Sequence, residues 1–325
     1  MADGVRELGE RVRTAIERIV VGNEAAIAGL LLALFGDGHL LIEGVPGTAK
    51  TLLARLLARL LEADFRRIQF TPDLLPSDVV GTTIFDAESA RFALRRGPIF
   101  ASVVLADEIN RTPPKTQSAL LEAMEERAVT IDGERHPLPA FFMVCATQNP
   151  IEFEGTYPLP EAQLDRFFAR AQTGYPSAQA ERALLARGAA GFDARDLAAD
   201  GVVAVATTAE LLGARAVVRT IFVAEPLVGY VQEIAAATRS ARELSLGASP
   251  RAALALVRAA QTAAALEGRG FATPDDVKSS ANAVLAHRLA VEPEAEIEGA
   301  SAEGVLARIL ATVPVPQIVE PAPRA

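Results

Sequence analysis

The chain has 325 residues, of which 50% are hydrophobic and 22% are charged, and its formal net charge is −9 at pH 7. This length corresponds to about two domains, and the composition excludes a mainly disordered chain. The single cysteine excludes an intramolecular disulfide framework and a cysteine-cluster metal site, and the acidic balance argues against nucleic-acid binding by bulk electrostatics.

The apolar segments are too short to cross a membrane. The best candidate, residues 27–35, is interrupted at once by Gly36, Asp37 and Gly38, whereas a membrane span needs roughly 18 apolar residues. The N-terminus carries Asp3 where a signal peptide needs basic residues, and no apolar segment follows it directly. We therefore expect a soluble, cytoplasmic protein.

Strands and helices are predicted to alternate through the first half of the chain. The spacing of apolar residues predicts an N-terminal helix, a break at residues 20–23, and a second helix over 24–35. The next segments in chain order are strand 39–43, helix 52–61, strand 65–70, strand 99–105, helix 116–127, strand 141–147 and strand 168–173. Two hairpins interrupt the alternation, one within 82–94 and one around the turn Asp132-Gly133. This order predicts a parallel sheet covered by helices on both faces.

Strand signals become sparse after about residue 176. Alanine-rich helical segments follow at 178–187, 227–242, 251–266 and 274–288, and a proline-rich tail ends the sequence. Thr273 as an N-cap and Pro274 at the first helical position are typical of a helix start. The prediction is therefore an α/β domain over 1–176 and a smaller helical domain over 177–325.

A glycine-rich loop separates the strand at 39–43 from the helix at 52–61. It reads Gly44-Val45-Pro46-Gly47-Thr48-Ala49-Lys50-Thr51. In such a loop, backbone N–H groups and the helix N-terminus surround phosphates, Lys50 reaches the β- and γ-phosphates, and the Thr51 hydroxyl ligates Mg²⁺. Ala49 replaces a second glycine, which we expect to be tolerated if the backbone there is near-helical. The alternative, an ordinary strand-to-helix turn, is disfavoured by the flanking strand and helix.

Two carboxylates, Asp107 and Glu108, follow the apolar segment 99–105. The carboxyl ends of parallel strands meet at one edge of a sheet, so these side chains are expected beside the phosphate loop. We expect Asp107 to hold Mg²⁺ and Glu108 to accept a proton from the attacking water, or at least to orient it. A strand that simply ends in solvent is the alternative.

Asn149 follows the next predicted strand, at the end of Thr147-Gln148-Asn149. An uncharged amide at the same sheet edge can position the lytic water against the γ-phosphate. On spacing alone, an amide that only caps a turn is an alternative interpretation.

Two arginines are candidates for stabilising the charge that develops on the γ-phosphate. Arg166 stands beside an apolar pair, just before a predicted strand. Arg251 follows Ser249-Pro250 in the first turn of a helix, where a cation opposes the helix dipole, which favours a functional role. The alternatives are a surface ion pair with a helix carboxylate for Arg166 and a solvated side chain for Arg251.

The remaining ionisable groups are interpreted as structural. His39, His136 and His287 lack the spacing of metal ligands. Four glutamates between residues 292 and 298 are most simply a solvated face, and Cys145 is interpreted as a small buried hydrophobic residue.

Together these motifs resemble those of the AAA+ ATPases, and most closely those of the MoxR family, in which alanine commonly precedes the lysine of the phosphate loop. The motifs that carry the resemblance are residues 44–51, 69–78, 106–111, 146–150, 157–167 and 249–251. The resemblance covers nearly the whole chain, and the segments around Asn149 and Arg166 are far more specific than a phosphate loop alone. It implies an AAA+ core followed by an all-helical lid.

The resemblance also implies roles for the residues that bind and hydrolyse ATP. Lys50 and Thr51 match the Walker A motif, Asp107 and Glu108 match Walker B, and Asn149 matches sensor 1. These assignments agree with the chemistry expected from the spacing of the same residues.

The arginines and several flanking segments receive roles from the resemblance alone. Arg166 resembles an arginine finger, which reaches the nucleotide of a neighbouring subunit. Arg251 resembles sensor 2, and whether it acts on its own subunit's nucleotide or a neighbour's is open. Val20, Val21 and Gly22 match the segment that lines the adenine pocket. The two hairpins match the helix-2 insert and the pre-sensor-1 insert, both expected near a central pore.

Similar proteins form rings, usually hexamers, and act as chaperone-like ATPases beside partners with von Willebrand factor A-type domains. They aid metal or cofactor insertion, complex maturation or stress responses, so the implied function is remodelling of a protein partner with ATP and Mg²⁺. One alternative is a nucleic-acid motor of the same superfamily, such as a helicase or a restriction subunit, which the acidic charge disfavours. Another is a small-molecule kinase, which would need neither Arg166 nor a helical lid.

Overall fold

The structure is a computed structural model that describes residues 1–45, 47–86, 91–149, 155–193, 196–197 and 201–317. Its α-helices are α1 (Ala2–Glu17), α2 (Glu24–Phe35), α3 (Lys50–Leu60), α4 (Pro76–Val80), α5 (Pro114–Glu126), α6 (Glu161–Leu164), α7 (Ala178–Ala189), α8 (Thr208–Val218), α9 (Glu225–Ser240), α10 (Pro250–Leu266), α11 (Pro274–Leu285), α12 (Pro293–Ile297) and α13 (Ala302–Thr312). Its strands are β1 (Leu40–Gly44), β2 (Phe65–Gln69), β3 (Gly81–Asp86), β4 (Arg91–Arg96), β5 (Val103–Asp107), β6 (Ala128–Ile131), β7 (Glu134–Pro137), β8 (Met143–Gln148), β9 (Ala169–Thr173), β10 (Leu244–Leu246) and β11 (Ala290–Val291). Short 3₁₀-helices lie at η1 (Ile109–Arg111) and η2 (Ala286–Arg288).

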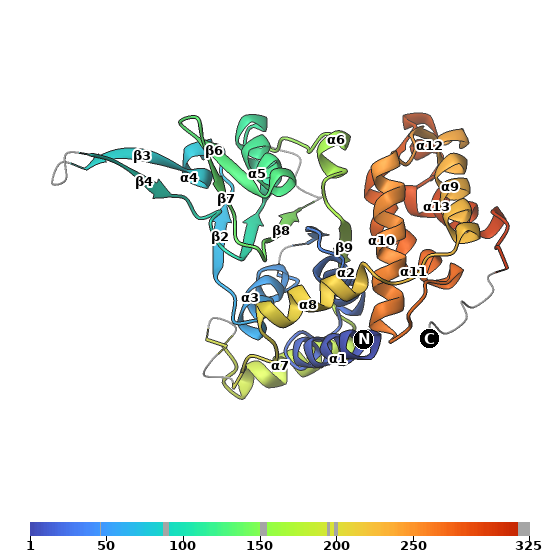
Figure 1. Ribbon diagram of the computed structural model, residues 1–325, viewed down its shortest axis with the longest axis horizontal. Coiled ribbons are helices and arrows are strands. Elements are labelled where there is room, and N and C mark those ends of the chain that lie inside the picture. Colours follow the sequence, from blue (N-terminus) through green and yellow to red (C-terminus); the bar gives the residue numbers. More distant parts are fainter. Residues whose placement is uncertain (46, 87–90, 150–154, 194–195, 198–200, 318–325) are drawn as a thin grey trace.

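Five strands form one parallel sheet in the order β2-β5-β8-β1-β9 (Figure 1). Successive side chains of a strand point to opposite faces, so Leu40 and Ile42 of β1 enter one hydrophobic cluster and Leu41 enters the other. Helices α2 and α3 contribute to the first cluster and α5 contributes to the second. The predicted α/β class, with a parallel sheet covered on both faces, is confirmed.

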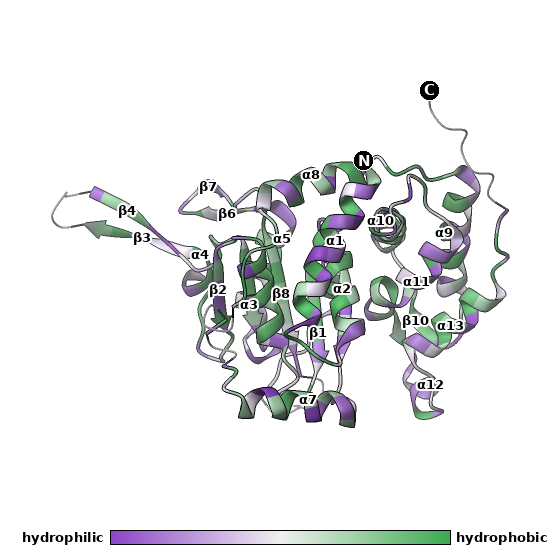
Figure 2. Cartoon of the chain, turned by 90° about the horizontal axis from the view of Figure 1, so that it is seen from below, coloured by the Kyte–Doolittle hydropathy of each residue, from purple (hydrophilic) through white to green (hydrophobic). Residues whose placement is uncertain are grey.

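Helix α2 is buried on almost every side. It contacts β1, β9, α1, α8 and α10, and both it and β8 are mainly hydrophobic in Figure 2. A helix that is buried on all sides must be apolar all round, so residues 27–35, the most apolar segment of the sequence, form a core helix. Across the part of the chain that the structure describes, no helix combines the length and the apolarity that a bilayer crossing requires.

Two antiparallel hairpins stand outside the sheet, as predicted. β3 pairs with β4 in a long arm that projects from the core (Figure 1), and its turn at 87–90 lies outside the described residues. Phe85 and Phe92 are exposed on this arm, and their rings meet edge to face with centroids 5.3 Å apart. β6 pairs with β7, and Asp132 and Gly133 at their turn both have the positive φ that a tight hairpin turn requires.

The helices that follow β9 form two groups. α9, α10, α11 and α13 pack together beside the sheet, on the right of Figure 1. α8 contacts α1 and α2 as well as α10, and Val205 and Ala206 donate backbone hydrogen bonds to Leu60 O at the end of α3. The domain boundary at residue 176 stays a prediction. The sequence also failed to predict α8 and α13, and it extended the helix at 274–288 through η2.

An ion cluster around the half-buried Asp37 joins the end of α2 to α8. The Asp37 carboxylate lies 2.6 Å from Arg215 Nη1, 2.9 Å from Arg127 Nη2 and 2.7 Å from Arg219 Nη2. Burial acts to raise the pKa of Asp37, but the three arginines outweigh it and hold that pKa below its ordinary value. Burial also lowers the pKa of Arg215 to about 10, which leaves the guanidinium charged at neutral pH.

We expect Asp37→Asn to lower the free energy of unfolding by about 2 kcal/mol or more at pH 7, because Arg215 loses its buried counter-charge. The pKa of Asp37 is lower in the folded chain than its unfolded value of about 3.9, so its stabilising effect is complete above that pH and is lost as the pH falls through the folded pKa. Urea unfolding of both proteins at neutral pH and at acid pH measures the difference. An equal difference at both pH values would contradict this account.

Candidate active site

The phosphate loop is fixed between β1 and α3. Gly44 has a φ of 155°, and a Cβ there would lie 2.1 Å from Thr173 O, so no side chain fits. The Thr48 hydroxyl hydrogen-bonds Val45 O at 2.9 Å and the Thr173 hydroxyl at 2.8 Å. The first contact closes the loop on itself, and the second holds it against β9. Pro46 lies outside the described residues.

Ala49 adopts a backbone conformation that the sequence did not predict. Its φ of 63° and ψ of 17° lie in the left-handed region, whereas we expected near-helical backbone there. An alanine in this region carries about 1 kcal/mol of strain, which a glycine would avoid. Ala49 also supplies no side-chain cap to α3, so the first N–H groups of that helix point to a position where phosphate oxygens could accept from them.

Lys50 places its ammonium group inside the loop. Its Nζ donates a hydrogen bond to Gly44 O at 2.5 Å. The cation therefore stands over the backbone that would surround the phosphates, as the Walker A assignment requires.

Asp107 and Glu108, the two carboxylates predicted to form the Walker B motif, lie where β5 ends. Glu108 has a φ of 58° and a ψ of 50°, a left-handed conformation that turns the chain sharply after Asp107. Thr147 of the neighbouring strand β8 stabilises this turn: its hydroxyl donates to Asp107 Oδ1 at 2.6 Å and accepts from the Glu108 backbone N–H at 2.9 Å. A strained residue held by such contacts is typical of functional sites.

Two side chains of β2 contact the same carboxylates, and sequence reasoning missed both. Arg67 Nη2 donates to Asp107 Oδ2 at 2.6 Å, and Gln69 Nε2 donates to Glu108 Oε2 at 2.8 Å. Alternation along β2 puts Arg67 and Gln69 on one face, and the parallel register sets Gln69 opposite Asp107. The polar i, i+2 pair was visible in the sequence, but only the strand order shows what it contacts.

A cavity of about 640 Å³ opens beside the loop and collects most of the predicted site residues. Its lining residues include Val20, Val21, Gly47, Thr48, Ala49, Lys50, Thr51, Asp107, Glu108 and Asn149. This volume is within the usual range for ligand pockets. Gly22 is not among its lining residues, but a Cβ there would lie 2.8 Å from Ala180 Cβ, so the glycine permits α7 to approach.

Helix α7 and the residues after it supply a wall of this cavity that the sequence did not predict. Leu184, Arg187 and Phe192 line it together with Val20 and Val21. Arg187 Nη1 donates to Ile19 O at 3.1 Å, and its guanidinium carbon lies 5.1 Å from the centre of the Phe192 ring. Apolar, aromatic and planar cationic groups in one wall suit a flat heteroaromatic ring such as adenine.

The residues at the phosphate end are compatible with Mg²⁺. Thr51 and Asp107 line the same cavity and offer the oxygen ligands that this ion prefers. No three His, Cys, Asp or Glu side chains among the described residues come together as a metal site of their own. Phosphate oxygens and water would therefore complete the coordination, as is usual for Mg²⁺ bound with a nucleotide.

Arg166 and Arg251 lie outside this cavity but next to each other. Arg166 Nη2 is 3.2 Å from Glu125 Oε2, and Arg251 Nη1 is 3.2 Å from Glu125 Oε1, so one carboxylate of α5 pairs with both. The ion pair with a helix carboxylate, which was the alternative interpretation of Arg166, is thus present in the single chain. Neither arginine lines the cavity that its own phosphate loop forms.

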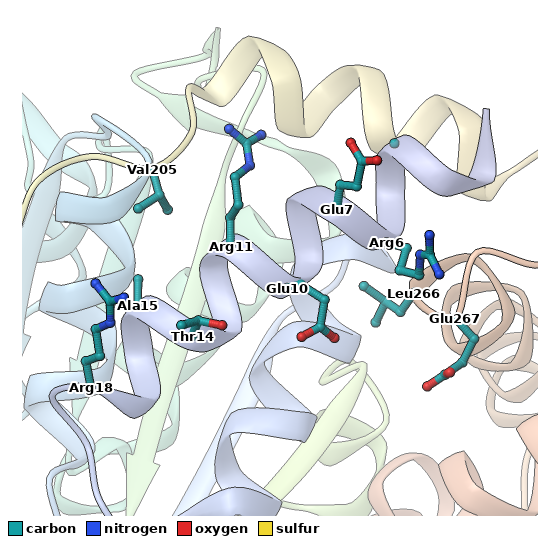
Figure 3. A pocket seen from close by; sticks show the side chains of 11 residues that line it. Arg6, Glu7, Glu10, Arg11, Thr14, Ala15, Arg18, Val205, Leu266 and Glu267 are labelled. Carbon is teal, nitrogen blue, oxygen red and sulfur yellow. The ribbon is translucent and has the colours of Figure 1, made fainter.

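A second hollow, of about 1100 Å³, extends along α1 between α8 and α10 (Figure 3). Charges of both signs line it, including Arg6, Glu7, Glu10 and Arg11. These side chains do not converge on one point in Figure 3, and no glycine-rich loop borders the hollow. The candidate nucleotide site is therefore the cavity at the phosphate loop.

Comparison with known proteins gives the class. Residues 39–169 match the ATPase family associated with various cellular activities (AAA), and residues 236–309 match the AAA lid domain. These matches agree with the parallel sheet, the phosphate loop and the helices beside the sheet. The chain is an AAA ATPase with a helical lid, and it hydrolyses ATP.

The similarity to individual proteins is closer. Chaperone MoxR1 of Mycobacterium tuberculosis is 43% identical over 319 residues, which are 95% of this chain and 82% of that protein. Protein MoxR of Methylorubrum extorquens is 33% identical over 96% of each chain. A crystal structure of a candidate ATPase from Cytophaga hutchinsonii superposes with a TM-score of 0.86 and 38% identity, over 97% of this chain and 98% of that chain. The chain belongs to the MoxR family of AAA+ ATPases.

We expect Lys50→Ala to abolish tight ATP binding, because the polyphosphate loses the main cation inside the loop. Calorimetric titration with ATP measures the effect. A matched control is Lys115→Ala, since Lys115 lies at the start of α5 and is not among the residues that line the cavity. Unchanged affinity in Lys50→Ala would refute the assignment of the phosphate loop.

Proposed function

We propose that this ATPase works as a ring and uses hydrolysis to remodel a protein partner, with ATP and Mg²⁺ in the cavity between the phosphate loop and α7. The observation that carries the proposal is the position of two arginines. Arg166 and Arg251 meet outside the cavity of their own chain. A site that lacks them within one chain can receive them from a second copy.

Each residue around the cavity has a definite task in this proposal. Mg²⁺, held by Thr51 and Asp107, supplies charge neutralisation on the phosphates when it is bound. Lys50 and the first N–H groups of α3 bind and orient the phosphates. Glu108 accepts the proton of the attacking water or orients it, and Asn149 positions that water.

The pairing of both arginines with Glu125 supports a joint action on one phosphate group. Arg166 and Arg251 contact the two oxygens of a single carboxylate. Two guanidinium groups at that separation can also address two oxygens of one phosphate, which attracts them more strongly because it carries more charge. We therefore propose that Arg251 acts in trans together with Arg166, which is one of the two possibilities that the sequence leaves open.

The larger assembly and the partner follow from the family. We propose a hexameric ring, with a partner that carries a von Willebrand factor A-type domain and a role in metal or cofactor insertion or in complex maturation. The name of the relative Chaperone MoxR1 supports a role on proteins. A cytoplasmic location stays a prediction of the sequence. An adjacent reading frame that encodes a von Willebrand factor A-type domain would support this choice of partner.

We expect Glu108→Gln to bind ATP but not to hydrolyse it, because an amide has the shape of the carboxylate and cannot take a proton. The variant should therefore accumulate as an ATP-bound assembly, and light scattering would detect its mass. Phosphate release at the wild-type rate would remove Glu108 from the mechanism.

We expect Arg166→Ala to retain ATP binding and to lose about 10³-fold or more in turnover, the size usual for an arginine finger. A Lys50→Ala subunit has a dead cavity and intact arginines, whereas an Arg166→Ala subunit has the reverse. Mixing the two variants should therefore restore phosphate release that neither shows alone. Full turnover by a chain that stays monomeric with ATP would contradict both the ring and the finger. Normal turnover by Arg166→Ala rings would return Arg166 to a surface ion pair.

A further inference from the structure

The lid holds the backbone on both sides of Arg166. Arg288, in η2 of the lid, donates from Nη2 to Phe167 O at 2.7 Å and to Asp165 O at 3.2 Å. His287 Nε2 lies 3.0 Å from the same Phe167 oxygen, and a carbonyl can only accept, so this nitrogen carries the proton. Arg166 itself stands between the two residues that the lid grips.

One carboxylate also joins the segment of Arg166 to the segment of Arg251. Asp165 Oδ2 accepts a hydrogen bond from the Ser249 hydroxyl at 2.9 Å, and Asp165 Oδ1 lies 2.9 Å from Arg288 Nε. Ser249 also accepts from Ala252 N at 3.0 Å and so caps α10, the helix in whose first turn Arg251 lies. Asp165 therefore directly precedes Arg166 in the chain and is hydrogen-bonded to Ser249, which lies two residues before Arg251.

The contacts among Arg288, Asp165 and Ser249 form a joint in which Arg288 is buried and the other two residues are half-buried. Arg288 is 5% exposed, and its Nη1 also donates to Val284 O at 2.8 Å. Burial lowers the pKa of Arg288 to about 10, and the nearby charge of Arg251 contributes in the same direction. The guanidinium is still charged at neutral pH. A buried charge must keep its partner, because removing one member of such a pair is strongly destabilising.

We propose that Arg288 and Asp165 are positioning residues for the arginines that act in trans, so that the lid sets Arg166 and Arg251 as one unit against the neighbouring nucleotide. This inference rests on the proposed trans action of Arg166. Neither Arg288 nor Asp165 lines the cavity of its own chain, so the effect of losing the joint falls on the neighbour's site. A subunit that lacks the joint can still hydrolyse ATP in its own cavity when an intact neighbour supplies the arginines.

The test separates the arginines that a subunit supplies to its neighbour from the arginines that its own cavity receives. In a mixture, the Lys50→Ala subunit is the donor of arginines and the Arg166→Ala subunit is the acceptor, with an intact cavity. Arg288→Met is then added either to the donor or to the acceptor, and phosphate release from each mixture is measured. We expect release to fall at least about tenfold with the change in the donor and less than about twofold with the change in the acceptor.

Arg215→Met is the matched control. Arg215 is also a buried arginine, 3% exposed, with a pKa near 10, a carboxylate partner in Asp37 and a backbone acceptor in Leu34 O. Arg215 belongs to α8, and the contacts named here do not involve the segment of Arg166. We expect Arg215→Met to lower the unfolding midpoint without any difference between donor and acceptor. Asp165→Asn, which removes the charge with little change in shape, should reproduce the donor defect if Arg288→Met does not fold.

The outcomes distinguish this inference from the function on which it rests. No recovered release in the parent mixture would overturn the trans finger, and the positioning role with it. With either Arg288→Met or Asp165→Asn, the recovered release could fall equally in the donor and in the acceptor. That result would leave the trans finger intact and show that the joint only stabilises the fold. Unchanged release with either variant in the donor would also overturn the positioning role.

Discussion

Burial of both faces of the parallel sheet is the constraint on which the rest of this structure depends. Because Leu40 and Ile42 enter one hydrophobic cluster and Leu41 enters the other, the first three residues of β1 leave no face for a polar group, and Glu43 comes only near the carboxyl end of the strand. In the inner strands β1, β5 and β8, polar side chains therefore stand toward the carboxyl ends, which lie at one edge of a parallel sheet. That is why the phosphate loop after β1, Asp107 at the end of β5 and Asn149 after β8 line a single cavity.

Local sequence patterns predicted the functional residues at these strand ends, but not the side chains of other elements that contact them. The phosphate loop and the carboxylates stand in short contiguous motifs, so spacing alone located them. Arg67 and Gln69 reach the carboxylates only because β2 lies beside β5, and a pairing between strands cannot be seen in either strand. The wall formed by Arg187 and Phe192 depends on how α7 folds back onto residues 19–21. The left-handed backbone at Ala49 was missed because its side chain gives no sign of it.

Arg166 and Arg251 show the same limit of local sequence patterns, because their motifs indicated a role but not the residue they contact in the single chain. Their sequence motifs indicated a role at the γ-phosphate, and the structure shows both of them paired with Glu125 instead. An ion pair half open to water contributes little to stability, about 0–1 kcal/mol. In the ring that we propose, a weak pair is a suitable resting partner, since a nucleotide of a neighbouring subunit would displace Glu125 at small cost. The ion pair seen in the single chain is therefore compatible with a catalytic role for the same two arginines.

Two arginines, the buried Arg288 and the half-buried Arg170, attach the lid to the strip of chain that runs from Asp165 into β9. Arg288 of the lid grips the start of this strip at Asp165 and Phe167. A few residues on, Arg170 of β9 lies 3.3 Å from Glu43, directly before the phosphate loop, and also pairs with Glu303 of α13. The strip thus touches the loop that would bind this chain's own nucleotide, the lid, and Arg166, for which we propose a role on the next subunit. Since each contact is buried or half-buried and charged, moving the lid costs least when the strip moves with it, and in the proposed ring this strip is the physical path by which one nucleotide site would influence the next.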